Sequence, residues 1–114
     1  MATYDAFDVV VVPFPFTDRT STKRRPALVL SVEDFHRKTG HLVLAMITSA
    51  AHSSWANDVV LQEWKRIGLP HASIVRSKLF TLDERLVLRR VGALEPVDRE
   101  QVIDALQKCL YSFR

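Results

Sequence analysis

The chain has 114 residues, of which 47% are hydrophobic and 25% charged, with a formal net charge of +3 and a pI of about 9.4. This composition is that of a globular protein and excludes disordered and collagen-like chains, and the length predicts a single domain over residues 1–114. The longest apolar run, Val9–Phe16, contains two prolines and is far shorter than the ~20 residues of a membrane-spanning helix. Asp5 and Asp8 lie where a signal peptide would carry basic and apolar residues, and the single cysteine, Cys109, allows no internal disulfide. We therefore expect a cytoplasmic protein with no membrane segment.

The first half of the chain predicts three β-strands. The strand segments are Asp8–Phe14, Arg25–Ser31 and His41–Thr48, each apolar and bounded by prolines or polar residues. Thr17–Arg24 is expected to form a loop, and Glu33–Gly40 a polar turn. Taken in order, the three strands predict an antiparallel meander.

The second half predicts three further strands separated by connections. The strand segments are Asp58–Leu61, Ser73–Thr81 and Leu86–Gly92. The small residues of Ser49–Asn57 and the Gly and Pro of Gln62–Pro70 indicate connecting segments. No internal repeat or interdomain linker is present.

The C-terminal segment predicts the one clear helix. Asp98 is expected at the N-cap with Gln101 three residues later, the capping-box spacing. An apolar face then recurs at spacings of three and four, made of Val102, Ile103, Leu106, Cys109 and Leu110. On this face Cys109 is expected to be a small core residue. The fold class predicted is mainly β with a C-terminal helix, as a small, strongly bent β-barrel.

Most catalytic and metal-binding patterns are absent. The four histidines, His36, His41, His52 and His71, show no metal-ligand spacing, and there is no cysteine pair. The three glycines are too far apart for a phosphate-binding loop, and no nucleophile elbow occurs. We therefore expect neither a metal nor a cofactor, and ordinary surface roles for the histidines.

Basic residues gather before the second strand. Arg19, Lys23, Arg24 and Arg25 lie within seven positions beside several Ser and Thr residues. Such a cluster is consistent either with a phosphate-contact surface or with a solvated charged loop.

Arg25 lies directly before Pro26, whose ring restricts the backbone there. Thr48 and Ser49 end the third strand, and a meander would bring that end to Arg25. A guanidinium and a hydroxyl in this position could hold a phosphodiester. The alternative is an arginine that caps the edge of a sheet.

These segments resemble the PemK/MazF family of bacterial toxins. The similarity is carried by Asp8–Asp18 (DVVVVPFPFTD), Lys23–Ser31 (KRRPALVLS) and Ala45–Ser49 (AMITS). It continues through Trp64, Gly68–Pro70, Ser73–Arg76, Lys78–Asp83 and Val91–Leu94, so it extends in order over nearly the whole chain.

The resemblance implies an SH3-like barrel and a homodimer that cuts single-stranded RNA without a metal. It also implies the toxin of a type II toxin–antitoxin pair, neutralised by a small cognate antitoxin protein. By position it assigns catalysis to Arg25 and Thr48. It assigns substrate contacts to Lys23, Arg24, Arg19 and Ser49, and it places Arg76 where some members carry another catalytic arginine.

The implied reaction uses the ribose 2′-OH as nucleophile and leaves a 2′,3′-cyclic phosphate and a 5′-OH. DNA lacks that hydroxyl and is expected to be inert. We expect Arg25 to neutralise the phosphorane and Thr48 to position the phosphate, because a threonine hydroxyl is a poor base.

Two positions depart from the family pattern. Phe7 stands where many members have glycine before the first strand. Arg76 is followed by no carboxylate until Asp83, so a structural salt bridge is as consistent with its position as a substrate contact. Two other functions stay open: a gyrase-binding toxin like CcdB, and a weakly catalytic partner of an antitoxin repressor.

Overall fold

The computed structural model describes residues 3–14, 23–51 and 54–112. Over these residues, six strands form one antiparallel sheet in the order β4-β5-β3-β2-β1-β6. The strands are β1 (Asp8–Pro13), β2 (Arg24–Val29), β3 (His41–Ser49), β4 (Val59–Val60), β5 (Ser73–Asp83) and β6 (Arg89–Ala93). The α-helices are α1 (Glu33–Thr39), α2 (Trp64–Ile67) and α3 (Pro96–Cys109).

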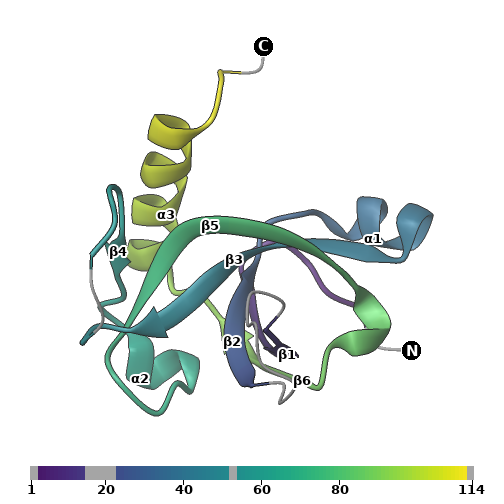
Figure 1. Ribbon diagram of the computed structural model, residues 1–114, viewed down its shortest axis with the longest axis horizontal. Helices are drawn as coiled ribbons and strands as arrows, with labels where there is room; N and C mark the ends of the chain where they lie inside the picture. The colour runs from purple at the N-terminus through teal and green to yellow at the C-terminus, as the bar shows by residue number, and fades with distance from the viewer. Residues whose placement is uncertain (1–2, 15–22, 52–53, 113–114) are drawn as a thin grey trace.

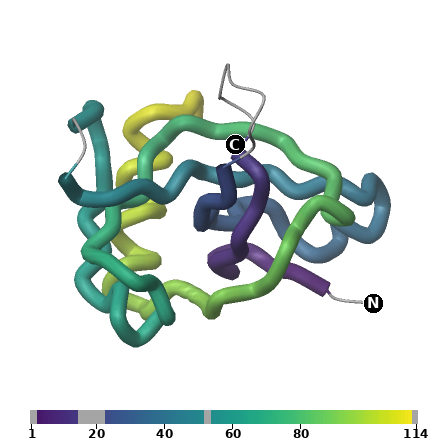
Figure 2. Tube along the Cα trace, turned by 60° about the horizontal axis from the view of Figure 1, so that its bottom comes forward, coloured from purple at the N-terminus to yellow at the C-terminus, as the bar shows by residue number. Residues whose placement is uncertain are grey.

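The sheet is strongly curved. The two longest strands, β3 and β5, bend over β1 and β2, and α1 and α3 lie at opposite ends of the molecule (Figures 1 and 2). The predicted class, mainly β with a C-terminal helix in a small barrel-like fold, is confirmed, with the sheet forming a half-barrel. No helix in the described ranges has the length and hydropathy of a membrane-spanning segment.

Both faces of the sheet are buried, which explains why the strands are nearly continuous apolar runs. In β1, Val9 belongs to the core that packs against α3, through Val102 and Ala105. Its neighbours Val10 and Val12 point to the opposite face and join a second core inside the curve. The alternation along each strand therefore divides one sheet between two cores.

The meander predicted for the first three strands is confirmed. β1 pairs antiparallel with β2, and β2 with β3. β2 ends at Val29 and not at Ser31, and β6 begins at Arg89 and not at Leu86. The later start of β6 follows from a short 3₁₀ helix over Glu84–Leu86.

The expectation of a polar turn at Glu33–Gly40 is wrong, because Glu33–Thr39 forms helix α1. Acidic residues occupy its first turn and basic residues its last, which complements the helix dipole. Arg37 and Lys38 form ion pairs with acidic residues one turn earlier. Gly40, with φ 71°, ends the helix in the left-handed conformation.

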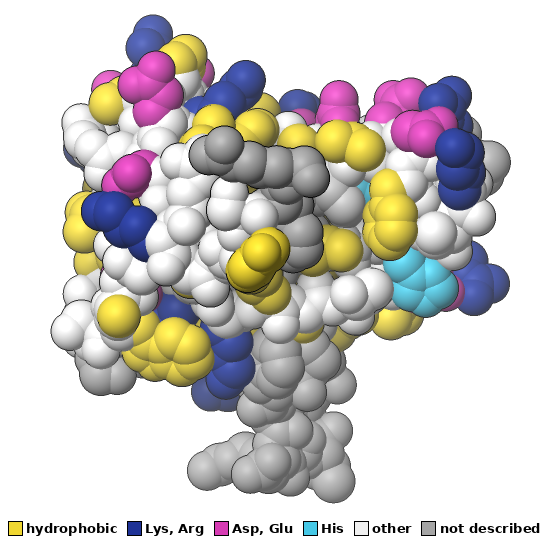
Figure 3. All heavy atoms as spheres, turned by 90° about the horizontal axis from the view of Figure 1, so that it is seen from above, with side chains coloured by type: hydrophobic (Ala, Val, Ile, Leu, Met, Phe, Trp, Pro, Cys, Tyr) yellow, Lys and Arg dark blue, Asp and Glu magenta, His cyan; other side chains and the backbone are white. Residues whose placement is uncertain are grey.

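Acidic and basic side chains also lie side by side on the surface seen in Figure 3, with hydrophobic side chains between them. The ion pairs of α1 are part of this mixed surface.

The capping role predicted for Asp98 is also wrong. The N-cap is Glu95, three residues earlier, and helix α3 begins at Pro96, which suits the first helical position because its missing N–H would have no helical partner there. Asp98 is fully buried, and its carboxylate accepts hydrogen bonds from the backbone N–H groups of Gln62 (2.7 Å) and Glu63 (3.0 Å). It therefore ties the start of α3 to the segment that precedes α2.

Only part of the predicted apolar face of α3 packs against the sheet. Val102 is buried and Leu106 is partly buried. Ile103 and Leu110 are exposed, and so is Cys109, which corrects its expected core position. Ala105 occupies the core position instead, because the buried stripe runs through Asp98, Val102 and Ala105.

Candidate active site at the ends of β2 and β3

A pocket of about 460 Å³ lies where three segments meet. Its walls are Lys23–Pro26 at the start of β2, Ile47–Ser49 at the end of β3, and Pro70, His71 and Ser73 before and at the start of β5. The strand order β5-β3-β2 puts the end of β3 in the middle of these three segments. The pocket therefore contains both residues that the sequence predicts to be catalytic.

Pro26 explains why the sheet opens here. The ladder between β2 and β3 runs over Ala27↔Met46, Leu28↔Ala45 and Val29↔Leu44 and goes no further toward the start of β2. Proline has no N–H with which to extend that ladder. The β3–β5 ladder, by contrast, continues to Ser49↔Ser73. The space between the start of β2 and the end of β3 is the pocket.

Arg25 is half-buried and fixed from the β1 side. It pairs with Val12 in the β1–β2 register, and its guanidinium lies 5.5 Å from the centre of the Phe14 ring. Its Nε is buried without a hydrogen-bond partner in the described part of the chain. A buried guanidinium N–H that lacks an acceptor costs free energy, and an anion in the pocket would supply one.

Three residues with hydroxyl groups, Thr48, Ser49 and Ser73, line the pocket. Thr48 is 4% exposed, and Ser73, near it on β5, is 5% exposed. The Ser73 hydroxyl donates a hydrogen bond to the carbonyl oxygen of His71 (2.9 Å) and so fixes the backbone there. Ser49 is half-buried, and its hydroxyl accepts a hydrogen bond from the N–H of Ala51 (3.2 Å).

The other basic residues predicted as substrate contacts fall in different places. Lys23 and Arg24 are exposed and line the pocket. Arg19 lies outside the described residues.

His71 was expected to be an ordinary surface residue, but it lines the pocket. Its position was missed because nothing local in the sequence relates residue 71 to residues 25 and 48.

Arg76 does not line this pocket. Its guanidinium donates to Asp58 from Nε (3.2 Å) and from a terminal nitrogen (3.0 Å), and both side chains are more than nine-tenths buried. The β3–β5 ladder is irregular next to Arg76, because Ala45 pairs with Leu79 and the next residue, Met46, pairs with Arg76. Such irregularities change the direction in which nearby side chains point. The indole of Trp55 lies 5.3 Å from the guanidinium carbon.

The pair between Arg76 and Asp58 determines the charge of the carboxyl group. Burial is the largest influence and would raise the pKa of Asp58, but the hydrogen bonds from Arg76 and from the Trp55 N–H, with the positive charge of Arg76, outweigh it. The pKa of Asp58 therefore lies below its ordinary value of 3.8. No carboxylate follows Arg76 directly in the sequence. Its acidic partner is instead Asp58, in the segment before β4.

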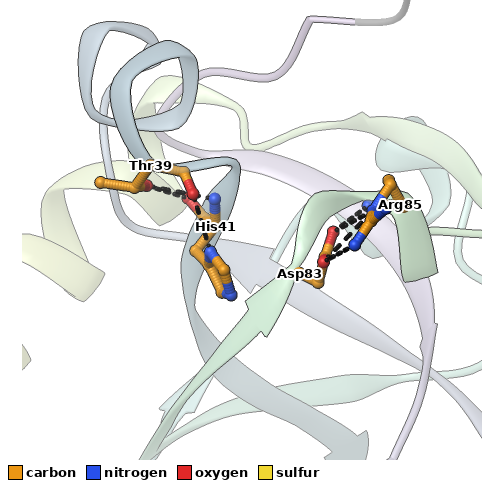
Figure 4. A network of polar contacts seen from close by, with 4 residues as sticks. All are labelled: Thr39, His41, Asp83 and Arg85. Atoms are coloured by element: carbon orange, nitrogen blue, oxygen red, sulfur yellow. Dashed lines mark hydrogen bonds and ion pairs between the residues drawn. The ribbon is translucent and has the colours of Figure 1, made fainter.

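Another hollow, of about 310 Å³, lies at the other end of β3 and β5. It is lined by residues that include His41, Asp83 and Arg85. The ring of His41 makes a hydrogen bond with the Thr39 carbonyl oxygen (2.9 Å), and Arg85 forms an ion pair with Asp83, lowering the pKa of that carboxyl to about 2 (Figure 4). Since these groups are paired with near neighbours and lie far along the strands from Thr48, they form a separate surface site. Among the described residues, no group of three His, Cys, Asp or Glu side chains is placed to hold a metal ion.

Comparison with known families gives one match over most of the chain. Residues 5–110 match the model of the PemK-like, MazF-like toxins of type II toxin–antitoxin systems. No curated protein matches the chain in sequence.

Solved structures share the fold. An endoribonuclease in complex with its cognate antitoxin from a mycobacterial species is 16% identical, with a TM-score of 0.75 and 100% of both chains covered. MazF from Deinococcus radiodurans is 22% identical, with a TM-score of 0.76 and 96% and 97% covered. A MazE–MazF structure from the same organism is 24% identical, with a TM-score of 0.76 and 95% and 96% covered.

Proposed function

The chain belongs to the family of PemK-like, MazF-like toxins of type II toxin–antitoxin systems, and from this premise we propose that it cleaves single-stranded RNA in the pocket that contains Arg25 and Thr48. Toxins of this family are endoribonucleases. The observation that carries the proposal is that Arg25, whose buried Nε has no acceptor among the described residues, lines the same pocket as Thr48. A phosphodiester supplies the anion that this guanidinium lacks.

The proposed reaction is a transesterification within RNA. The ribose 2′-oxygen attacks the adjacent phosphorus, the bond from phosphorus to the 5′-oxygen breaks, and the products carry a 2′,3′-cyclic phosphate and a 5′-OH. Arg25 neutralises the charge that develops on the phosphoryl oxygens, and Thr48 positions the phosphate. The cationic and hydroxyl side chains of the pocket supply this stabilisation without a metal ion.

Lys23, Arg24 and Ser49 extend the pocket as substrate contacts in this proposal. Arg19 belongs to the same basic cluster in sequence. We propose that Arg76 holds Asp58 in place and does not contact the substrate, since its guanidinium already binds that carboxylate through two nitrogens.

We further propose a cytoplasmic homodimer that a cognate antitoxin neutralises. Solved relatives include an endoribonuclease with its cognate antitoxin and a MazE–MazF structure. An acidic antitoxin segment would complement Lys23, Arg24 and Arg25 at the pocket. Exposed apolar residues on α3 and directly after it, among them Ile103 and Leu110, are surface that an interface would bury.

The test is cleavage of a long single-stranded RNA by the purified protein in EDTA. We expect discrete fragments whose 5′-OH ends accept phosphate directly from a polynucleotide kinase, and no cleavage of a DNA of the same sequence. Fragments with 5′-phosphate ends would contradict the proposed chemistry. No cleavage by the folded protein would contradict the nuclease function and favour a gyrase-binding or antitoxin-partner function.

A further inference from the structure

The proposed reaction requires a group that can accept a proton, and the pocket contains one side chain suited to this. Attack by the 2′-oxygen is assisted when its proton is removed. Arginine stays protonated at any physiological pH, lysine ordinarily does so at neutral pH, and serine and threonine hydroxyls are poor bases. Among the described residues that line the pocket, His71 alone is of a type that changes its charge between about pH 5 and 8.

The position of His71 relative to Arg25 follows from the strand order. β3 lies between β2 and β5, so Thr48, at the end of β3, has Arg25 of β2 on one side and the segment before β5 on the other. His71 lies in that segment, between Pro70 and the residues that pair with β3. The hydrogen bond from the Ser73 hydroxyl to the His71 carbonyl oxygen holds the backbone at this point.

This arrangement matches what an in-line displacement needs. The attacking and leaving oxygens lie on opposite sides of the phosphorus in such a reaction. For a phosphate bound over Thr48, the strand order β5-β3-β2 puts Arg25 of β2 on one side and the segment that holds His71 on the other. Arg25 can only donate hydrogen bonds, so it suits the side where negative charge grows on the leaving 5′-oxygen. The side of His71 is then that of the 2′-OH.

We propose that His71 is the general base of the cleavage reaction, an inference that rests on the ribonuclease function proposed above. The neutral imidazole takes the proton of the 2′-OH as the bond between the 2′-oxygen and phosphorus forms. The bond to the 5′-oxygen breaks with its electron pair, and that oxygen takes a proton from water. His71 is exposed and returns its proton to solvent before the next turnover.

Among the described residues, the charged groups that share the pocket with His71 are Lys23, Arg24 and Arg25, all from the start of β2. On the side of His71 itself, Pro70 and Ser73 carry no charge. The proposed base acts in its neutral form.

The test compares His71→Gln and His71→Ala with the wild-type protein on a short RNA that is cut once. We expect kcat to fall about 10²- to 10⁴-fold with little change in KM. Added imidazole should raise the rate of His71→Ala and leave that of His71→Gln unchanged, a rescue that a purely structural role would not give. His41→Gln is the matched control, because His41 is also exposed but lies at the opposite end of β3.

A second substrate separates a base from an acid. When sulfur replaces the bridging 5′-oxygen, the leaving group needs no proton, so loss of a general acid is repaired and loss of a general base is not. We expect His71→Gln to remain as impaired on this substrate as on ordinary RNA.

Three results would overturn the inference: both His71 variants within about threefold of the wild-type rate, no rescue by imidazole, or full recovery of His71→Gln on the sulfur substrate. A wild-type protein that cuts no RNA would instead remove the ribonuclease function on which the inference rests, so the two failures are distinguishable.

Discussion

Arg25 and Arg76 show how the same side chain takes two roles in one small protein. Arg76 is 5% exposed and binds the Asp58 carboxylate through two nitrogens. Arg25 is half-buried at a pocket, with a buried Nε that has no acceptor in the described residues. The first arrangement satisfies the guanidinium within the fold, and the second leaves it for a ligand.

The buried pair predicts a large effect for Asp58→Asn. The substitution keeps the size of the side chain but removes the negative charge that pairs with the buried guanidinium of Arg76. We expect the free energy of unfolding at pH 7 to fall by about 3–5 kcal/mol, measured by urea denaturation. Asp34→Asn, which breaks exposed ion pairs on α1, should cost no more than about 1 kcal/mol.

The pair between Arg76 and Asp58 also predicts how the difference in unfolding free energy between the wild type and Asp58→Asn depends on pH. The pKa of Asp58 in the folded protein lies below its ordinary value of 3.8. A lowered folded pKa gives stability that is present above the ordinary pKa and is lost as the pH falls through the folded value. The stability of the wild type and that of Asp58→Asn should therefore converge below about pH 4, and a constant difference would contradict this account.

Phe7 is a bulky residue with a φ of 73°, in the left-handed region that favours glycine. Its backbone is held there by a hydrogen bond from its N–H to Val29 (2.7 Å) and one from the N–H of Leu94 to its own carbonyl oxygen (2.9 Å). The ring contributes by packing under the guanidinium of Arg99. Substitution should therefore separate the backbone cost from the contribution of the ring.

We expect Phe7→Gly to be more stable than Phe7→Ala by about 1 kcal/mol, the reverse of the usual order. Both variants lose the ring, so the difference between them reports the backbone alone. Thermal unfolding of the two variants measures it. An alanine variant as stable as the glycine variant would show that the left-handed conformation at residue 7 is not maintained.

At the scale of elements, close packing fixes where the segments around the pocket lie. A Cβ added at Gly92 in β6 would overlap the backbone carbonyl oxygen of Ile67, at the end of α2. A Cβ at Gly40 would meet no atom within 4 Å. The contact of α2 with β6 therefore depends on the absence of a side chain at Gly92, and α2 leads directly into the Pro70–Ser73 wall of the pocket.

We expect Gly92→Ala to destabilise the protein by about 1–3 kcal/mol through this overlap, and to lower RNA cleavage as well, because α2 must shift. Gly40→Ala is the control: it should cost about 1–2 kcal/mol for its left-handed backbone without affecting cleavage, since the pocket is at the other end of β3. Equal cleavage by the two variants, measured below their unfolding temperatures, would contradict the link between α2 and the pocket.

The elements also show what the sequence could and could not predict. The apolar runs placed β1, β2 and β3, and their meander brought Arg25 and Thr48 to one pocket. Helix α1 was missed although its acidic start, basic end and following Gly40 were visible, because its polar composition suggested a turn. Asp98 was misplaced because Pro96 starts the helix earlier. The partners of Asp98 lie 35 and 36 residues away and that of Arg76 lies 18 residues away, beyond what local spacing reports.

At the scale of the whole molecule, the net charge of +3 is small, and its distribution matters more. Cations on α1 are paired with acidic neighbours one turn away. Lys23, Arg24 and Arg25 instead lie together at the pocket. The long-range attraction of an RNA backbone should therefore be concentrated at the start of β2.

Binding of RNA should accordingly depend strongly on salt. For single strands the slope of log K against log salt changes by about 0.7 for each phosphate that a cationic side chain neutralises. Lys23→Gln should reduce the slope by about that amount, measured with a 2′-O-methyl RNA that the protein cannot cut. Lys38→Gln, on α1, should leave the slope unchanged. Equal slopes for wild type and Lys23→Gln would show that Lys23 contacts no phosphate.

The central claim, that RNA is cut in the pocket at Arg25, is tested most directly by one rate measurement. The single-turnover rate of RNA cleavage in EDTA is compared for the wild type, Arg25→Ala and Arg89→Ala, the last an exposed arginine of β6 that does not line the pocket. We expect Arg25→Ala to lower the rate about 10²- to 10³-fold, with Arg89→Ala close to the wild type. Cleavage by folded Arg25→Ala at the wild-type rate would contradict the claim and move the active site elsewhere.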